Sequence, residues 1–297
     1  MLGAAALIAA ALVLLARVPD RLAAAGWPTR CPLEALVLWQ SLGLAAGLLS
    51  LELALTVALA PYGATQVGAA RALLDGGERP TWWSLVAGAV GLLLLGRLLQ
   101  VLLDSVVRTL RARRRHRQLV DLLATRNPLV RGASVLEHDL PVAYCLPGLR
   151  PRVVVSQGAL LTLSGPELEA VLAHEQAHVD QRHDLVVLPF AALRATLPAS
   201  RAVCTASQEV ALLVEMLADD RAARSHDRTV LARALYKVGS GRPPQGSLAA
   251  ADRGVLLRAE RLLDPPPPLP ASARALVLAA AAGTAALPLL GLVVPLL

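Results

Sequence analysis

The sequence has few cysteines and few aromatic residues. Cys31, Cys145 and Cys204 are the only three cysteines in 297 residues and lie far apart, so neither a disulfide framework nor a cysteine metal cluster is expected. Aromatic residues make up 3% of the chain, which leaves no series of platforms on which bases could stack. These scarcities exclude a disulfide scaffold and argue against direct binding of nucleic acid.

Charged residues are also scarce. They form 17% of the chain, whereas 55% of the residues are hydrophobic. An ordinary soluble enzyme is far more polar, so the composition predicts a membrane protein. The net charge of +7 comes from arginine, because Lys237 is the only lysine. We read it as a bias of residue usage and not as a binding surface.

Four apolar segments are candidates for transmembrane helices: residues 2–16, 33–60, 82–107 and 271–297. The first could instead be a secretory signal, but it lacks the positively charged start that such a signal needs. We therefore predict three N-terminal transmembrane helices within residues 1–107. A proline-rich linker at 265–270 precedes the fourth helix.

A cluster of arginines follows the third apolar segment: Arg108, Arg111, Arg113, Arg114, Arg115 and Arg117. Such a cluster could bind nucleic acid, but beside a membrane helix it is typical of the cytoplasmic flank. We therefore expect a multi-pass protein of the cell membrane. Its polar domain, residues 108–264, is predicted to face the cytoplasm.

The polar domain begins with short strand patterns at 135–136, 142–146 and 152–156, the last two separated by a turn at Pro147-Gly148. Ser164-Gly165-Pro166-Glu167 then has the pattern of a capping box, with proline in the first turn. We expect a small sheet followed by a helix that begins at Ser164.

That helix carries His174-Glu175-x-x-His178. Residues four apart are neighbours on one helix face, so both imidazoles can reach the same metal ion. The carboxylate of Glu175 can then act on a water bound to that metal. This is the arrangement of a hydrolytic zinc site.

A catalytic zinc normally takes three protein ligands, so one more is required. His183 is close in sequence, but Gln181 and Asp184 do not fit the three-histidine pattern. Glu215 and Asp219 lie four apart in a later helical segment. We predict that Glu215 binds the metal and that Asp219 accepts a hydrogen bond from a histidine ligand.

Residues 185–204 lie between the two motifs and are apolar enough to suggest another membrane crossing. A single crossing would put His174 and Glu215 on opposite sides of the bilayer. The segment is therefore predicted to be a membrane-associated helix or a shallow hairpin.

Together these features resemble the membrane zinc metallopeptidases that include the BlaR/MecR antirepressor proteases and, more distantly, the HtpX and CAAX-prenyl protease group. The matching features are the two zinc motifs, the stretches that start at Val142 and Arg152, the Arg182-His-Asp-Leu segment, and the three apolar helices before the domain with one after it. The resemblance implies a mainly α membrane protein. Its transmembrane helices would accompany a small α+β zincin-like domain with a short antiparallel sheet.

The resemblance also implies a function, namely a gluzincin-type metalloendopeptidase with one Zn²⁺ per chain. Its partner would be a protein substrate, either a transcriptional repressor or, as in the HtpX group, a misfolded membrane protein. Substrate pairing is implied along the strand Arg152, Val153, Val154, Val155 and Ser156. The extracellular penicillin-binding domain of the β-lactam sensors is not expected here.

Two further points stay open in the sequence. No sequence pattern identifies the group that stabilises the oxyanion. Arg221 and His226 are named as candidates for this role, although each fits a surface residue better. A membrane scaffold that keeps zinc for structure is the competing hypothesis, but a structural site has no use for a general base such as Glu175. The sequence gives no basis for predicting the oligomeric state.

Overall fold

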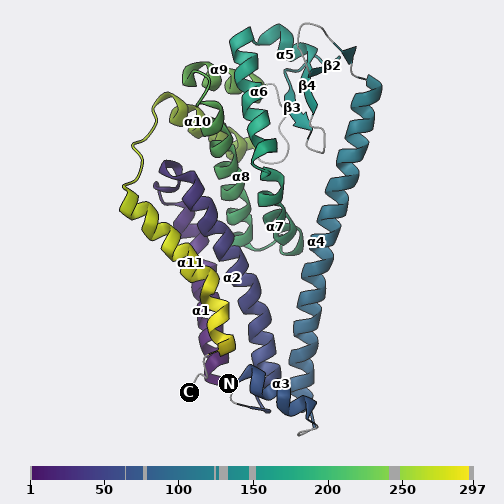
Figure 1. Ribbon diagram of the computed structural model, residues 1–297, viewed down its shortest axis with the longest axis vertical. Helices are drawn as coiled ribbons and strands as arrows, with labels where there is room; N and C mark the ends of the chain where they lie inside the picture. Colours follow the sequence, from purple (N-terminus) through teal and green to yellow (C-terminus); the bar gives the residue numbers. More distant parts are fainter. Residues whose placement is uncertain are drawn as a thin grey trace. The chain divides into compact units, whose positions relative to one another are not determined.

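The computed structural model of the chain describes residues 2–63, 65–75, 79–123, 125–126, 133–146, 152–240 and 248–293. The described chain is mainly α-helical with one small sheet (Figure 1), which confirms the predicted fold class. It divides into two compact units. The apolar unit comprises Met1–Leu103, Phe190–Val210 and Leu269–Leu297, and the polar unit comprises Asp104–Pro189 and Ala211–Pro268.

The apolar unit is built around the helix α2. Its elements are α1 (Leu2–Ala23), η1 (Pro28–Arg30), α2 (Pro32–Leu59), α3 (Gln66–Leu74), the first part of α4 (Trp82–Leu123) and α11 (Ala271–Val293). Both α1 and α11 pack along α2 (Figure 1). Arg274 Nε donates a hydrogen bond of 2.6 Å to Glu34 Oε1, which is buried, and so ties α11 to α2.

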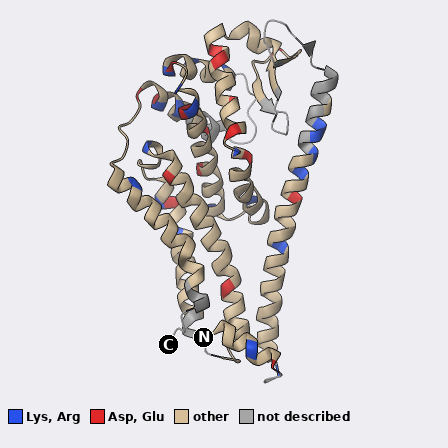
Figure 2. Ribbon diagram, viewed as in Figure 1, with Lys and Arg blue, Asp and Glu red and all other residues tan. Residues whose placement is uncertain are grey.

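Three helices of the described chain are long and apolar enough to cross a membrane, namely Pro32–Leu59, Trp82–Arg111 and Ala271–Leu289. Figure 2 shows few charged residues along them. The spans in α4 and α11 expose most of their apolar side chains, an arrangement suited to lipid. The predicted span at 2–16 forms part of α1, which also carries Arg17, Asp20 and Arg21. Its assignment as a span stays a prediction.

The arginine cluster lies on the same helix as the third span. α4 continues without a break from Trp82 to Leu123, so residues 108–117 extend the helix beyond the apolar segment. The predicted flank is therefore helical.

The predicted membrane-associated segment 185–204 consists of two helices and the turn between them. α7 (His183–Thr196) and α8 (Arg201–Ala222) are joined by residues 197–200. Phe190 of α7 is buried, and its ring lies 3.5 Å from the position that a Cβ on Gly43 of α2 would take. Thr205 of α8 donates a hydrogen bond to Asp20 of α1. The tip of this helical hairpin thus packs with the apolar helices.

The polar unit contains a four-stranded sheet in the order β1-β2-β4-β3. The strands are β1 (Thr125–Arg126), β2 (Ala133–Leu136), β3 (Ala143–Leu146) and β4 (Arg152–Ser156). The three strands predicted from the sequence correspond to β2, β3 and β4. The turn predicted at Pro147-Gly148 lies outside the described residues.

The sheet corrects two predictions. It is mixed and not antiparallel, because β4 runs antiparallel to β3 but parallel to β2. β4 returns in the direction of β2 and inserts between β2 and β3, so both of its edges are paired. The prediction that a substrate pairs with the strand Arg152–Ser156 by strand addition is therefore wrong. Strand addition needs an open edge, and in the described sheet β3 is an edge strand.

The second part of α4 precedes the sheet in the polar unit, and the other helices of this unit follow the sheet. They are α5 (Gln157–Thr162), α6 (Gly165–Asp180), the first part of α7, the second part of α8, α9 (Arg228–Ser240) and α10 (Leu248–Leu263). α6 packs against β3 and α9, and α9 packs against α10. The predicted capping box is confirmed, since Glu167 Oε2 accepts hydrogen bonds from the backbone N–H and the hydroxyl of Ser164. It fixes the start of the helix that carries the histidines.

Candidate metal centre

Two histidines of α6 point at a common position. His174 and His178 are four residues apart on the helix, and their Nε2 atoms lie 3.2 Å from each other. His174 is 3% exposed, whereas His178 is partly open to a cavity. The third and fourth turns of α6 therefore present two nitrogen donors at one place.

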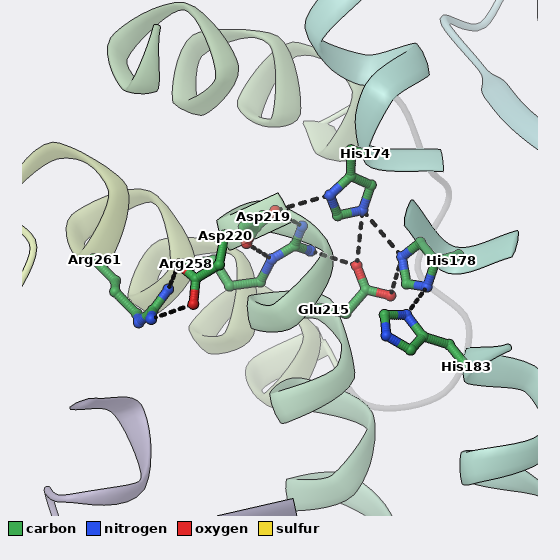
Figure 3. Close-up of polar contacts among 8 residues, drawn as sticks. All are labelled: His174, His178, His183, Glu215, Asp219, Asp220, Arg258 and Arg261. Atoms are coloured by element: carbon green, nitrogen blue, oxygen red, sulfur yellow. Dashed lines mark hydrogen bonds and ion pairs between the residues drawn. The ribbon is translucent and has the colours of Figure 1, made fainter. Parts of the chain in front are cut away.

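Glu215 of α8 supplies an oxygen donor at the same position (Figure 3). Its Oε2 lies 3.4 Å from His174 Nε2, and its Oε1 lies 3.5 Å from His178 Nε2. Ligands bound to zinc at about 2.0–2.2 Å in a tetrahedron are separated by roughly 3.3–3.5 Å. The three side chains form a group that could hold a metal ion, and their spacing suits a tetrahedral ion with one position left open.

The other ring nitrogen of His174 faces Asp219 of α8. Nδ1 lies 2.9 Å from Asp219 Oδ1, at ion-pair distance, and this buried nitrogen has no hydrogen bond of good geometry among the described residues. A carboxylate in this place holds the ring with Nε2 toward the metal position. Asp219 therefore lies beside His174, one of the predicted metal ligands.

Arg258 of α10 joins both carboxylates of α8. Its Nε and Nη2 donate to Asp219 Oδ2 and Oδ1 at 2.7 and 2.8 Å, and its Nη1 lies 2.9 Å from Glu215 Oε2. Asp219 is 1% exposed, and a buried carboxylate needs such a partner to stay ionised. Arg258 belongs to no motif in the sequence and was not predicted to be part of the site.

His183, the first residue of α7, contacts His178. Its Nδ1 lies 2.9 Å from His178 Nδ1, and its Nε2 lies 3.0 Å from Gln181 Oε1. His183 thus meets the nitrogen of His178 that does not face Glu215 (Figure 3). Its contact with a candidate ligand is a role that the sequence did not predict.

The environment shifts the pKa values of the two histidines in opposite directions. Burial lowers the pKa of His174, but Asp219 and Glu215 outweigh burial and raise it to about 9. Burial dominates for His178 and lowers its pKa to about 4. Burial disfavours the charged carboxylate of Glu215 and raises its pKa, yet His174 and Arg258 outweigh burial and lower the pKa to about 2. Without metal, the site therefore has an ionised carboxylate and a neutral His178 at pH 7.

The site opens into a cavity of about 270 Å³. Glu175 lines it together with the three candidate ligands, and Tyr236 and Arg258 line it from α9 and α10. Its apolar wall includes Val171, Leu235, Val238 and Val255. Glu175 therefore faces the same space as the open metal position, as a general base must.

A second cavity, of about 350 Å³, shares His178 and Glu215 with the first. Its apolar lining is Val179, Val187, Ala211 and Val214. The two cavities meet at the candidate ligands, so the metal position has space on more than one side.

The nominal oxyanion candidates are not found at the site. In the described part of the chain, neither Arg221 nor His226 lines either cavity. His226 Nδ1 lies 3.0 Å from Ser225 Oγ and 3.4 Å from the carbonyl oxygen of Ala222, at the end of α8. Tyr236 of α9 does line the first cavity. Its helix carries no motif, so no sequence pattern pointed to this residue.

Comparison with known families gives one match. Residues 109–223 match the model of Peptidase family M48, a stretch that includes the sheet and the helices α5, α6, α7 and α8. No curated protein and no solved structure matches the chain. The family match and the three candidate spans support a membrane metallopeptidase.

Proposed function

We propose that this chain is a membrane-bound, zinc-dependent endopeptidase of the gluzincin type. The observation that carries the proposal is the convergence of His174, His178 and Glu215 at tetrahedral spacing, with Glu175 lining the same cavity. Two histidines, one glutamate and an open position form a donor set typical of catalytic zinc. The match to Peptidase family M48 supports the same reaction class.

The proposed mechanism assigns roles to the residues around the metal. A bound zinc ion would supply Lewis acidity toward the scissile carbonyl and toward water. Glu175 takes the proton from the attacking water and gives it to the leaving amine. Asp219 and Arg258 keep His174 and Glu215 in place. Tyr236, a hydrogen-bond donor on the cavity wall, is the group we assign to the developing oxyanion.

We also propose that the substrate pairs with β3 in place of β4. In the described sheet β3 is an edge strand, and it packs against the helix α6 that carries the histidines. An extended peptide added to this edge would run beside the metal position. Substrate peptides N-methylated at alternating backbone positions test this, because methylation should block cleavage only where an amide pairs with β3.

The proposed location is the cytoplasmic side of the membrane. The arginines between positions 108 and 117 continue the third candidate span, and such a flank is typical of the cytoplasmic side. Labelling of single cysteines introduced beside Arg114 in intact and in opened cells tests the assignment. Labelling in intact cells by an impermeant reagent would overturn it.

The central experiment compares the wild type with Glu175→Gln, measuring bound zinc and casein cleavage in detergent. We expect the variant to keep its zinc and to lose cleavage by about 10²–10⁴-fold. Glu169→Gln, which alters an exposed carboxylate on the same helix, is the matched control and should behave as the wild type. Equal cleavage by the wild type and Glu175→Gln would refute the peptidase proposal.

A further inference from the structure

The connection between α6 and α7 is tight. α6 ends at Asp180, and α7 begins at His183. Between them Arg182 has a φ of 50°, a left-handed conformation that residues other than glycine rarely adopt. Its carbonyl accepts a hydrogen bond of 2.9 Å from the backbone N–H of Leu185. This residue interrupts the helix between α6 and α7, and His183 directly after it lies against His178 of α6.

His183 is buried beside the candidate metal centre. The residue is 4% exposed, and both of its ring nitrogens have partners in the described structure. Nδ1 lies 2.9 Å from His178 Nδ1, and Nε2 lies 3.0 Å from Gln181 Oε1. A chain of polar contacts therefore runs from Gln181 through His183 to His178.

The positions of the hydrogen atoms along this series of contacts follow from which atoms can donate and which can accept. The amide oxygen of Gln181 can only accept, so His183 Nε2 carries the hydrogen, and its Nδ1 is left as an acceptor. His178 must then donate from Nδ1 to His183. In that tautomer the Nε2 atom of His178 is a free electron-pair donor on the side of Glu215, which is the form that binds a metal.

The opposite assignment conflicts with metal binding. If His183 donated from Nδ1, the amide of Gln181 would have to turn and donate to Nε2. His178 would then carry its hydrogen on Nε2, the atom that faces His174 and Glu215. Nε2 could not then coordinate a metal at that position, so only the first assignment is compatible with a metal at this site.

We propose that His183, held by Gln181, is a positioning residue that fixes the orientation and tautomer of His178 for metal binding. It does for the second histidine what Asp219 does for His174. The inference rests on the metal site of the proposed function, but not on the hydrolysis of any substrate. Partners of this kind typically contribute 10–100-fold to metal affinity.

The test measures zinc affinity by competition with a chelator and the absorption spectrum of the Co²⁺-loaded protein. In His183→Leu the acceptor is lost, and we expect zinc to bind about 10–100-fold more weakly, with an altered Co²⁺ spectrum. In His183→Asn the amide oxygen can take the place of Nδ1, so affinity and spectrum should return toward the wild type. His226→Leu, which removes a histidine outside both cavities, is the matched control.

A second variant covers the case in which His183→Leu does not fold. Gln181 is exposed, so Gln181→Leu should fold, lose the anchor of His183 and weaken zinc binding several-fold. Wild-type affinity and an unchanged Co²⁺ spectrum in His183→Leu, or in Gln181→Leu if it alone folds, would overturn the inference. So would an absence of zinc binding by the wild type.

The two proposals fail in different ways. If the wild type and Glu175→Gln show equal cleavage while His183→Leu loses zinc affinity, only the peptidase function is wrong. If cleavage depends on Glu175 but zinc affinity is unchanged by His183→Leu, only the role of His183 is wrong.

Discussion

Arg258 of α10 holds Asp219 of α8 through two parallel hydrogen bonds, from Nε at 2.7 Å and from Nη2 at 2.8 Å. The same guanidinium lies 2.9 Å from Glu215 through Nη1. One side chain from a helix near the end of the chain thus supports a candidate metal ligand and the partner of another. The metal centre depends on α10 as well as on the two helices that carry its motifs.

Removal of Arg258 should therefore affect both stability and metal binding. In Arg258→Met the buried carboxylate of Asp219 loses its cation, and breaking a buried pair in this way typically costs about 3–5 kcal/mol. We expect a large fall in the unfolding temperature and zinc binding weakened by roughly 10–100-fold. Thermal unfolding by circular dichroism and chelator competition measure the two effects.

Arg261 provides the matched control for this variant. It lies three residues after Arg258 on α10 and forms a similar fork with Asp220, at 2.7 Å from each nitrogen. Asp220 does not contact the candidate ligands, so Arg261→Met should lower stability without changing zinc affinity in the folded protein. Equal zinc affinities in Arg258→Met and Arg261→Met would contradict the supporting role of Arg258.

Zinc binding should depend on pH because of His174. Its pKa is about 9 in the metal-free site, where burial is outweighed by Asp219 and Glu215. The ring therefore carries a proton at pH 7, and a metal must displace that proton to bind. The apparent zinc affinity should rise by about tenfold per pH unit between pH 7 and 9, the slope for one displaced proton. Calorimetry in buffers with different ionisation enthalpies counts the proton directly.

Asp219→Asn separates this effect from the general pH dependence of metal ligands. Without the carboxylate the pKa of His174 should fall, so the slope between pH 7 and 9 should flatten although overall affinity is lower. A wild-type affinity that does not change over this range would show that His174 is already neutral at pH 7.

The sequence predicted the parts of the site that local helix geometry determines. A spacing of four residues puts His174 beside His178 and Glu215 beside Asp219 on any α-helix. Bringing the two pairs together required only one further assumption, that both serve the same metal. The capping box at Ser164 is likewise a local pattern, and it defined the start of α6 correctly.

The parts that the sequence did not predict depend on long-range geometry. On a continuous helix His183 would lie about 140° around from His178, because five residues cover 500° at 100° per residue. The helix is interrupted at Arg182, which is left-handed, and the two rings meet. Arg258 lies on a helix far along the chain and has no motif among many arginines. The strand patterns were recognised, but no pattern reveals that β4 lies between β2 and β3.

The contact between Glu167 at the start of α6 and Lys237 of α9 should make the stability of the polar unit sensitive to acid. Lys237 of α9 donates to Glu167 Oε2 at 2.7 Å, and this contact, followed by the backbone N–H of Ser164, lowers the pKa of Glu167. A carboxyl with a lowered pKa stabilises the fold above its unfolded pKa, about 4.3. That stabilisation is lost as the pH falls through the lower, folded-state pKa.

Thermal unfolding followed between pH 7 and 3 checks this expectation. Glu167→Gln should be less stable than the wild type at pH 7, and the difference should shrink as the pH falls below about 4. Glu169→Gln, at an exposed position on the same helix, should follow the wild type throughout. A constant difference between Glu167→Gln and the wild type at all pH values would show that the ionised carboxylate is not what matters.

The left-handed residue between α6 and α7 gives a last prediction, which connects backbone conformation to metal binding. Arg182 has a φ of 50°, and this conformation costs a residue with a side chain about 1–2 kcal/mol. Glycine avoids that cost but loses about 0.5–1 kcal/mol through the freedom of the unfolded chain. Arg182→Gly should therefore be as stable as the wild type or more stable by up to about 1.5 kcal/mol, with unchanged zinc affinity. A β-branched residue tolerates the left-handed region least, so Arg182→Val should either unfold more easily or shift the turn. A shifted turn would move His183 away from His178, and thermal unfolding together with chelator competition should then show that stability and zinc affinity fall together. If Arg182→Val were as stable as Arg182→Gly and bound zinc as tightly, the turn would not be what holds His183 at the metal centre.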